Sequence, residues 1–357
     1  MKTALSIICC LWAPSAALGA EEWRPPPPAG DDGFDWVELK SGEWLKGRIK
    51  SMQDEKLEFD SEELDLHTFD WKDIRTLRSP RLQSIRLGKE KPAEGTLLVT
   101  TDEVQVTNQT GTETHPRAEL LAIAPTGGRE VDKWTADVSF GISFRSGNTK
   151  VVDANTQARF QRRTPITRLT LDYLGNYEKI NGTESENNHR IIDQFDLFLS
   201  RRLFVRVPDI EYYHDPLQNL NHRLTLGGAV GYDLIKTPRT EWNFAIGPAY
   251  QRNWYESVEP GQDKTTDSVA GVLSSRFDME LTKRIDLILE YRGQLTGRRQ
   301  GSNMHHGVVT LEFEIHKRLT FDTSFVWDRI ANPETESDGF TPEKDDFRLI
   351  TAVGIHF

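Results

Sequence analysis

The sequence predicts an all-β protein, in which a transmembrane antiparallel β-barrel of about 12 strands follows a small periplasmic β domain. The first observation is the last stretch, 347–357, where apolar and polar residues alternate to the final aromatic, Phe357. A period of two indicates a β-strand. A terminal aromatic on its apolar face is typical of the strand that closes an outer-membrane barrel. An edge strand of a soluble β-sandwich is the alternative explanation.

The other two observations concern the whole chain. It has 357 residues and a formal net charge of -11, so nucleic acid is not an expected partner. No apolar run reaches the roughly 18 residues of a transmembrane helix, whereas alternating stretches recur from Trp134 onward. The turns between them are mostly tight on one side and long on the other, as in a barrel with both ends in the periplasm.

Residues 1–20 are predicted to be a secretory signal peptide, with Lys2 as the charged start and Ala17 to Ala20 around the cleavage site. Both cysteines, Cys9 and Cys10, fall inside it. A mature chain without disulfides suits a bacterial envelope protein. Residues 21–33 form a Pro-rich linker, because consecutive prolines favour an extended, stiff chain.

Residues 34–124 are predicted to form the small all-β periplasmic domain. Its strands are expected at 36–40, 44–49, 56–59, 69–77, 95–100, 103–107 and 119–123, separated by turn residues. The tryptophans of this domain fit either core packing or a binding face for a periplasmic partner. Residues 125–133 are a second linker.

Residues 134–357 are predicted to form the barrel. Tight turns are expected at 164–166, 200–202, 236–240, 282–284 and 317–318. Long loops are expected at 181–188, 215–221, 256–266, 297–303 and 332–346, whereas the turn at 146–149 is short. Aromatic residues near the strand ends match the interfacial girdle of a membrane barrel.

One face of the alternating strands carries charges of both signs, and these residues are predicted to face the lumen: Asp137, Asp153, Arg159, Asp172, Arg276, Asp278, Glu290, Arg292, Glu312, Glu314 and Asp322. They would either line a narrow wet channel or fill the lumen as paired ions. Val353, Ile355 and Phe357 form the predicted assembly signal, so the barrel assembly machinery and outer-membrane lipid are the expected partners.

Three stretches resemble a known family: "VSFGISFRSGNTK" at 138–150, "YYHDPLQNLNHRLTLGGAVGYDLI" at 212–235, and the closing strand. They are similar to the DUF481 proteins, often labelled salt-induced outer-membrane proteins. The resemblance implies a barrel in the cell outer membrane, and residues 21–133 are then expected in the periplasm. It does not cover the domain ahead of the barrel.

No catalytic, cofactor-binding or metal site is predicted, because no phosphate loop, zinc-protease helix or nucleophile elbow is present. Two alternatives to a channel remain. In one, the barrel anchors a periplasmic binding domain. In the other, the protein is a lipid-modifying enzyme that uses a serine such as Ser185 with His189, His214 or His222 at the rim.

Overall fold

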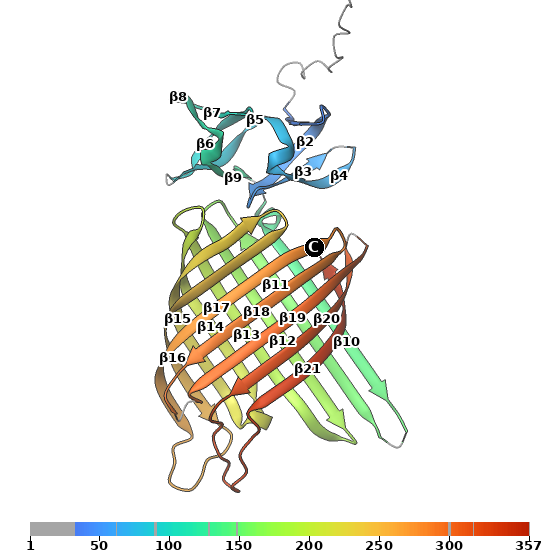
Figure 1. The fold of residues 1–357 in the computed structure, drawn as a ribbon, viewed down its shortest axis with the longest axis vertical. Coiled ribbons are helices and arrows are strands. Elements are labelled where there is room, and N and C mark those ends of the chain that lie inside the picture. Colours follow the sequence, from blue (N-terminus) through green and yellow to red (C-terminus); the bar gives the residue numbers. More distant parts are fainter. Residues whose placement is uncertain are drawn as a thin grey trace, which may run out of the picture.

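The computed structural model describes residues 33–356, apart from 62, 89–90, 128, 148, 299–300 and 317. A domain built on one nine-stranded sheet stands at one end of a closed barrel of twelve strands (Figure 1). The predicted signal peptide, the linker up to residue 32 and Phe357 lie outside the described residues. In the part described, no helix is long and apolar enough to cross a membrane.

The N-terminal domain follows the sheet order β4-β3-β2-β1-β5-β6-β7-β8. The last strand, β9, pairs with both β2 and β5, so it lies between two strands that are distant in the sheet. The strands are β1 (Asp35–Leu39), β2 (Trp44–Gln53), β3 (Lys56–Ser61), β4 (Asp65–Asp70), β5 (Ile74–Leu87), β6 (Ala93–Val99), β7 (Glu103–Asn108), β8 (Gly111–Pro116) and β9 (Leu120–Pro125). Short 3-10 turns occupy η1 (Trp71–Asp73), η2 (Arg117–Glu119) and, before the barrel, η3 (Glu130–Lys133).

The core of this domain consists of alternate apolar residues from most of its strands, including the fully buried Val37, Leu57 and Phe59. The predicted strand 69–77 is wrong, because η1 divides it into β4 and β5. The guanidinium of Arg117 donates to the carbonyls of Trp71 and Ile74 and stacks on the Trp71 ring, which fixes this break. Strand β8 was not predicted, since its polar, exposed sequence has no apolar alternation.

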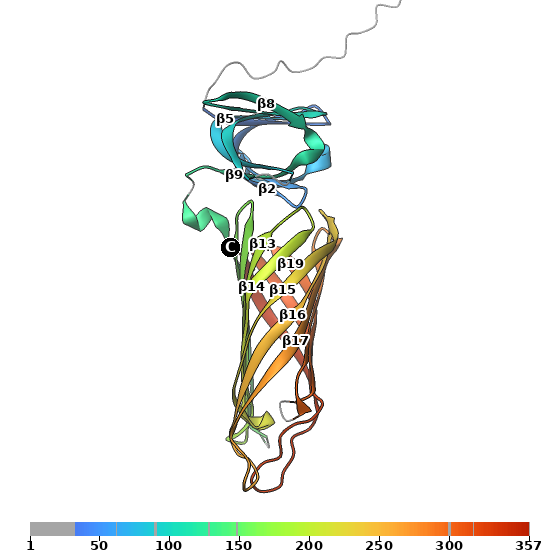
Figure 2. The same cartoon turned by 90° about the vertical axis from the view of Figure 1, so that its left-hand side faces the viewer.

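The barrel strands are joined in sequence order and each pair is antiparallel. They are β10 (Trp134–Arg145), β11 (Val151–Arg163), β12 (Thr167–Ile180), β13 (Thr183–Phe198), β14 (Leu203–Asp215), β15 (Leu220–Thr237), β16 (Thr240–Tyr255), β17 (Thr265–Thr282), β18 (Ile285–Leu295), β19 (Asn303–His316), β20 (Leu319–Ile330) and β21 (Asp345–His356). The 3-10 turn η4 (Pro216–Gln218) joins β14 to β15. The barrel is flattened, broad in Figure 1 and narrow in Figure 2, so its two wide walls lie close together.

The outward face of the barrel is apolar. Phe140, Leu226, Val269, Phe325 and Leu349, from five different strands, are all exposed there, although they are large hydrophobic residues. Their neighbours along each strand face the interior and are mostly small, polar or charged. An apolar exterior around a polar interior defines a transmembrane β-barrel.

Tight turns lie at the end that faces the N-terminal domain, called here the domain end, and most of the longer connections lie at the opposite loop end. One predicted loop is wrong: β12 and β13 continue through 181–188 and meet at the two-residue turn Asn181-Gly182. Both turn residues have positive φ, 53° and 86°. Asn-Gly is the preferred pair for such a hairpin turn, so the polar residues that follow belong to a strand.

The barrel closes where β10 pairs with β21. The paired residues run from Asp137 to Phe140 on one strand and from Val353 to His356 on the other. By comparison, β16 and β17 pair from Thr240 to Trp254 without a register shift. The closing seam is therefore a short ladder.

Candidate functional site

A cavity of about 920 Å³ occupies the domain-end half of the lumen and is called here the chamber. Its wall is charged and comes from both wide faces of the barrel, and Asp54, Lys56, Thr68 and Asp70 of the N-terminal domain also line it. Towards the loop end, the chamber reaches Arg190, Arg292 and His306. The next space beyond these side chains measures only about 20 Å³, which is about the room for one water molecule.

The structure places the residues predicted to face the lumen as follows. Ten of the eleven line the chamber: Asp137, Arg159, Asp172, Arg276, Asp278, Glu290, Arg292, Glu312, Glu314 and Asp322. Asp153 does not line it, because it lies nearer the loop end of β11, opposite Glu178. Val353 and Ile355 are exposed on β21, while the assembly role given to them and to Phe357 stays a prediction.

In the middle of the chamber, opposite charges are paired across the lumen. Arg159 of β11 binds Asp172 of β12 through two nitrogens, at 2.6 and 2.8 Å, and reaches Glu290 of β18 at 2.7 Å. Arg276 of β17 donates to the same Glu290 oxygen at 2.5 Å. Glu290 thus joins two arginines from opposite walls, a contact that the flattening of the barrel permits.

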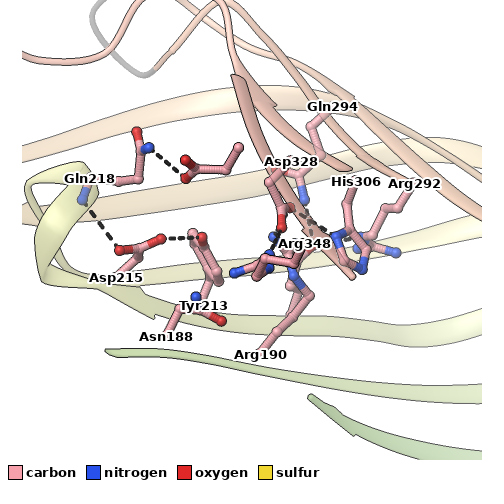
Figure 3. A network of polar contacts seen from close by, with 12 residues as sticks. Asn188, Arg190, Tyr213, Asp215, Gln218, Arg292, Gln294, His306, Asp328 and Arg348 are labelled. Carbon is pink, nitrogen blue, oxygen red and sulfur yellow. Dashed lines mark hydrogen bonds and ion pairs between the residues drawn. The ribbon is translucent and has the colours of Figure 1, made fainter. Parts of the chain in front are cut away.

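Seven ionisable side chains form a second level nearer the loop end, called here the ion layer: Arg190, Asp209, Glu211, Arg292, His306, Asp328 and Arg348. Arg190 on β13 binds Glu211 and also reaches Asp328 on β20 at 2.7 Å. Arg348 and His306 converge on the same Asp328 carboxylate (Figure 3). All seven side chains are buried or nearly so, with Glu211 at 1% exposure and Asp328 at 7%.

Arg292 completes the layer on the other side, where it donates to Glu211 at 2.5 Å and to Asp209 at 3.1 Å. Each acid of the layer is thus held by at least one cation, and β13 and β14 are tied to β18, β20 and β21 across the lumen. Buried ion pairs of this kind are costly to break, because a lone charge would remain without solvent.

An apolar cluster lies at the loop end beyond the ion layer: Tyr213, Leu220, Tyr255, Met304 and Ile330. The turn containing η4 folds over it. Asp215 caps this turn by accepting from the Gln218 backbone at 3.2 Å and from the Tyr213 hydroxyl at 2.6 Å. Asn219, at φ 57°, donates to the carbonyls of Ser257 and Glu334 in two other loops. The loop end is therefore filled by side chains and tied together by hydrogen bonds.

Sequence reasoning missed most of the ion layer, including Arg190, Asp209, Glu211 and Asp328. The cause on β14 is a register shift between Arg206 and Asp209, so that both residues face inward although they are an odd number of positions apart. Pro208, which cannot donate to the ladder, lies inside this irregularity. The signal that could have found the acids is the run from Asp209 to Asp215, whose alternate residues are polar or aromatic.

The domain end of the barrel is covered by the β2–β3 turn of the N-terminal domain. Asp54 in this turn accepts from Arg163 at 3.0 Å and from Lys236 at 2.7 Å, while Glu55 pairs with Arg201. Burial alone would raise the pKa of the Asp54 carboxyl, but the Arg163 and Lys236 cations overcome it and hold that pKa well below its ordinary value. Arg86 of β5 adds bonds to the carbonyls of Pro165 and Phe198, at 2.9 and 2.8 Å.

The rim residues considered for lipid chemistry have other partners. The Ser185 hydroxyl donates to Glu178 at 2.7 Å, and the His189 ring bonds the Tyr173 hydroxyl at 3.0 Å. His214 and His222 lie side by side, with ring centroids 5.7 Å apart. Within the described ranges, none of these histidines is hydrogen-bonded to Ser185, so the pairing that a nucleophile needs is not formed there.

The fold and the site together define a transmembrane β-barrel with a charged internal chamber. The chain belongs to the family described as "Protein of unknown function, DUF481", which matches residues 138–357. The match begins within β10, so the N-terminal domain lies outside it.

Solved structures with a similar arrangement include three membrane barrels. The NanC porin is 8% identical and is aligned over 62% of this chain and 98% of its own, with a TM-score of 0.37. The outer membrane protease OmpT from Escherichia coli is 12% identical over 65% of this chain and 98% of its own, with a TM-score of 0.28. The outer membrane channel DcaP of Acinetobacter baumannii is 11% identical over 91% and 94%, with a TM-score of 0.27. The comparison with curated proteins gives no match.

Proposed function

We propose that this protein is an integral outer-membrane channel for small ions or solutes that is closed at rest by the ion layer. The observation that carries the proposal is the change in the lumen from a chamber of about 920 Å³ to a space of about 20 Å³ across Arg190, Arg292 and His306. The chamber wall is polar and charged, which suits hydrated solutes. In this proposal the N-terminal domain lies in the periplasm and covers the inner mouth.

Single-channel recording in planar bilayers tests this proposal. The charge-balanced double variant Arg190→Ser with Glu211→Ser shortens two side chains of the ion layer and leaves Asp328 with Arg348 and His306. We expect steady, salt-dependent current steps from the variant and a silent bilayer from the native chain. The matched control is Arg252→Ser with Asp267→Ser, an exposed pair at 2.7 Å, which should stay silent.

Three outcomes would contradict the proposal. A large constitutive current from the native chain would mean that the ion layer does not close the lumen. Silence from the layer variant, while it still shows heat-modifiable migration in the outer-membrane fraction, would mean that the ion layer is not what closes the lumen, since the apolar cluster beyond it would still fill the loop end. Recovery of the native chain as a soluble periplasmic species would refute the location as well.

The contacts of Asp54, Glu55 and Arg86 with the barrel favour a second candidate, in which the barrel anchors a periplasmic binding domain. These contacts hold the domain by charge-assisted bonds as well as by the linker. If the ion-layer variant folds but gives no current, the anchor function remains as the candidate. Capture of a periplasmic partner by the complete chain would then test it.

A further inference from the structure

Four carboxylates lie in register around the chamber wall and are called here the carboxylate row. Glu280 of β17 is directly opposite Asp286 of β18, Asp286 is opposite Glu312 of β19, and Glu312 is opposite Asp322 of β20. All four line the chamber near its domain end. Like charges directly opposite each other destabilise a sheet, so four in a row is an unfavourable arrangement on its own.

Within the described part of the chain, the acids of this row are not paired with basic side chains, unlike the acids in the middle of the chamber and in the ion layer. In the middle of the chamber, Arg276 is directly opposite Glu290 and binds it. For the row, no ion pair with an arginine or lysine occurs in the part of the chain that the structure describes. Lys56 and Lys283 also line the chamber, and Lys56 acts on Asp286 from a distance, but among the described residues neither lysine forms an ion pair with the row.

Asp322 gives an independent sign that the row can accept a further donor, although the side chains of Thr320 and Ser139 already hydrogen-bond to its carboxylate. Its exposure is only 7%, and among the described residues its Oδ1 atom has no hydrogen-bond donor. Buried carboxylate oxygens nearly always have a partner, so a donor that enters from the chamber would satisfy this atom.

The geometry of the row indicates the shape of that donor. Adjacent strands are about 4.8 Å apart, so four strands spread the acids over roughly 14 Å. In the described ranges, no three acidic or histidine side chains converge closely enough to hold one metal ion. The arrangement therefore suits a linear molecule with several cationic donors along its length.

We propose that the carboxylate row is a binding site for a linear aliphatic polyamine, whose ammonium groups each meet one carboxylate. Ammonium groups donate up to three hydrogen bonds and can bridge neighbouring acids. The inference rests on the proposed function, because it names the class of solute that the chamber would admit.

Titration calorimetry on the purified mature chain in detergent tests the site, with spermidine as the probe and butylamine and Mg²⁺ as comparison ligands. Spermidine should bind at one site and more tightly than either comparison ligand. Asp322→Asn and Glu312→Gln should each weaken spermidine at least about tenfold, as expected for losing a charge-assisted bond. Glu343→Gln, a matched change of an exposed acid outside the chamber, should alter affinity less than about threefold.

Equal affinity for butylamine or Mg²⁺, or unchanged spermidine affinity in both row variants, would overturn the inference. If Asp322→Asn does not fold, the spermidine affinity of Glu312→Gln alone decides whether the inference holds. The result is separable from the channel test. Spermidine binding with no current from the ion-layer variant refutes the channel alone, whereas current without spermidine binding refutes this site alone.

Discussion

Three strands contribute side chains to both the ion layer and the carboxylate row. β18, β19 and β20 contribute Arg292, His306 and Asp328 to the layer, and Asp286, Glu312 and Asp322 to the row. Each pair lies six positions apart on one strand and so on one face. In the layer every acid has a cation within bonding distance, whereas in the row acids face acids. The first arrangement stabilises the folded barrel, and the second costs stability and leaves charge available to a solute.

The largest effect should come from the layer. Asp328→Asn removes the carboxylate that holds Arg190 and Arg348, and it leaves both guanidinium groups buried without that partner. We expect a loss of about 3–5 kcal/mol in unfolding free energy. Urea unfolding in lipid vesicles, followed by tryptophan fluorescence, measures it. Asp322→Asn, the same change six positions away on the same strand, should cause no loss of unfolding free energy. Equal losses in the two variants would contradict the difference between the ion layer and the carboxylate row.

A smaller loss of unfolding free energy is expected for changes in the middle of the chamber, between the ion layer and the carboxylate row. Glu290→Lys places a third cation beside Arg159 and Arg276, so it should lower the unfolding free energy by about 2 kcal/mol or more. Asp278→Lys should cost less, because Asp278 is 40% exposed and has a single 3.2 Å contact. The same urea series compares them. A neutral Glu290→Lys would mean that the middle of the chamber behaves as open solvent.

Paired charges like those of the ion layer also hold the N-terminal domain against the barrel. Asp54→Asn should weaken docking by about 1.5 kcal/mol, since it removes charge-assisted bonds to Arg163 and Lys236. The pKa of Asp54 is lower in the folded protein than in the unfolded chain, where it is about 4. The Asp54 carboxylate therefore stabilises docking fully at any pH above about 4, and this stabilisation is lost only as the pH falls through the lower folded pKa. The protection factors for amide hydrogen exchange at the β2–β3 turn, which are corrected for the pH dependence of the intrinsic rate, should therefore be the same at pH 7 and pH 5 in the native chain. Release of the turn at pH 5 would contradict this.

The smallest effect has the opposite sign. Without a ligand, Glu312→Gln should raise the unfolding free energy by about 0.2–1 kcal/mol, because it removes like-charge repulsion from both neighbours in the row. High salt should reduce the gain by screening. A destabilised Glu312→Gln variant would show that Glu312 has a favourable role in the fold, and the row would lose its contrast with the layer.

Alternation along the strands was enough to predict the barrel and to place Glu290, Glu312 and Asp322 on the inner face, since a period of two fixes the face of each residue. It could not predict which charges meet, because Arg159 reaches Glu290 only across a flattened lumen. It also failed where the period is interrupted, as at Pro208, where the register shift turned Asp209 and Glu211 inward. The polar strand β8 was not predicted, and the first residues of β13 were assigned to a loop, because their polar composition is typical of loops.

The short closing seam has a consequence for hydrogen exchange. Amide protons are protected in proportion to the free energy of opening the structure that holds them. The ladder between β10 and β21 runs only from Asp137 to Phe140, whereas the other barrel strands are held along most of their length. Opening at this seam breaks fewer bonds than opening anywhere else around the barrel. Local opening towards the surrounding lipid should thus begin between the first and the last strand, while the ion layer keeps the opposite walls joined.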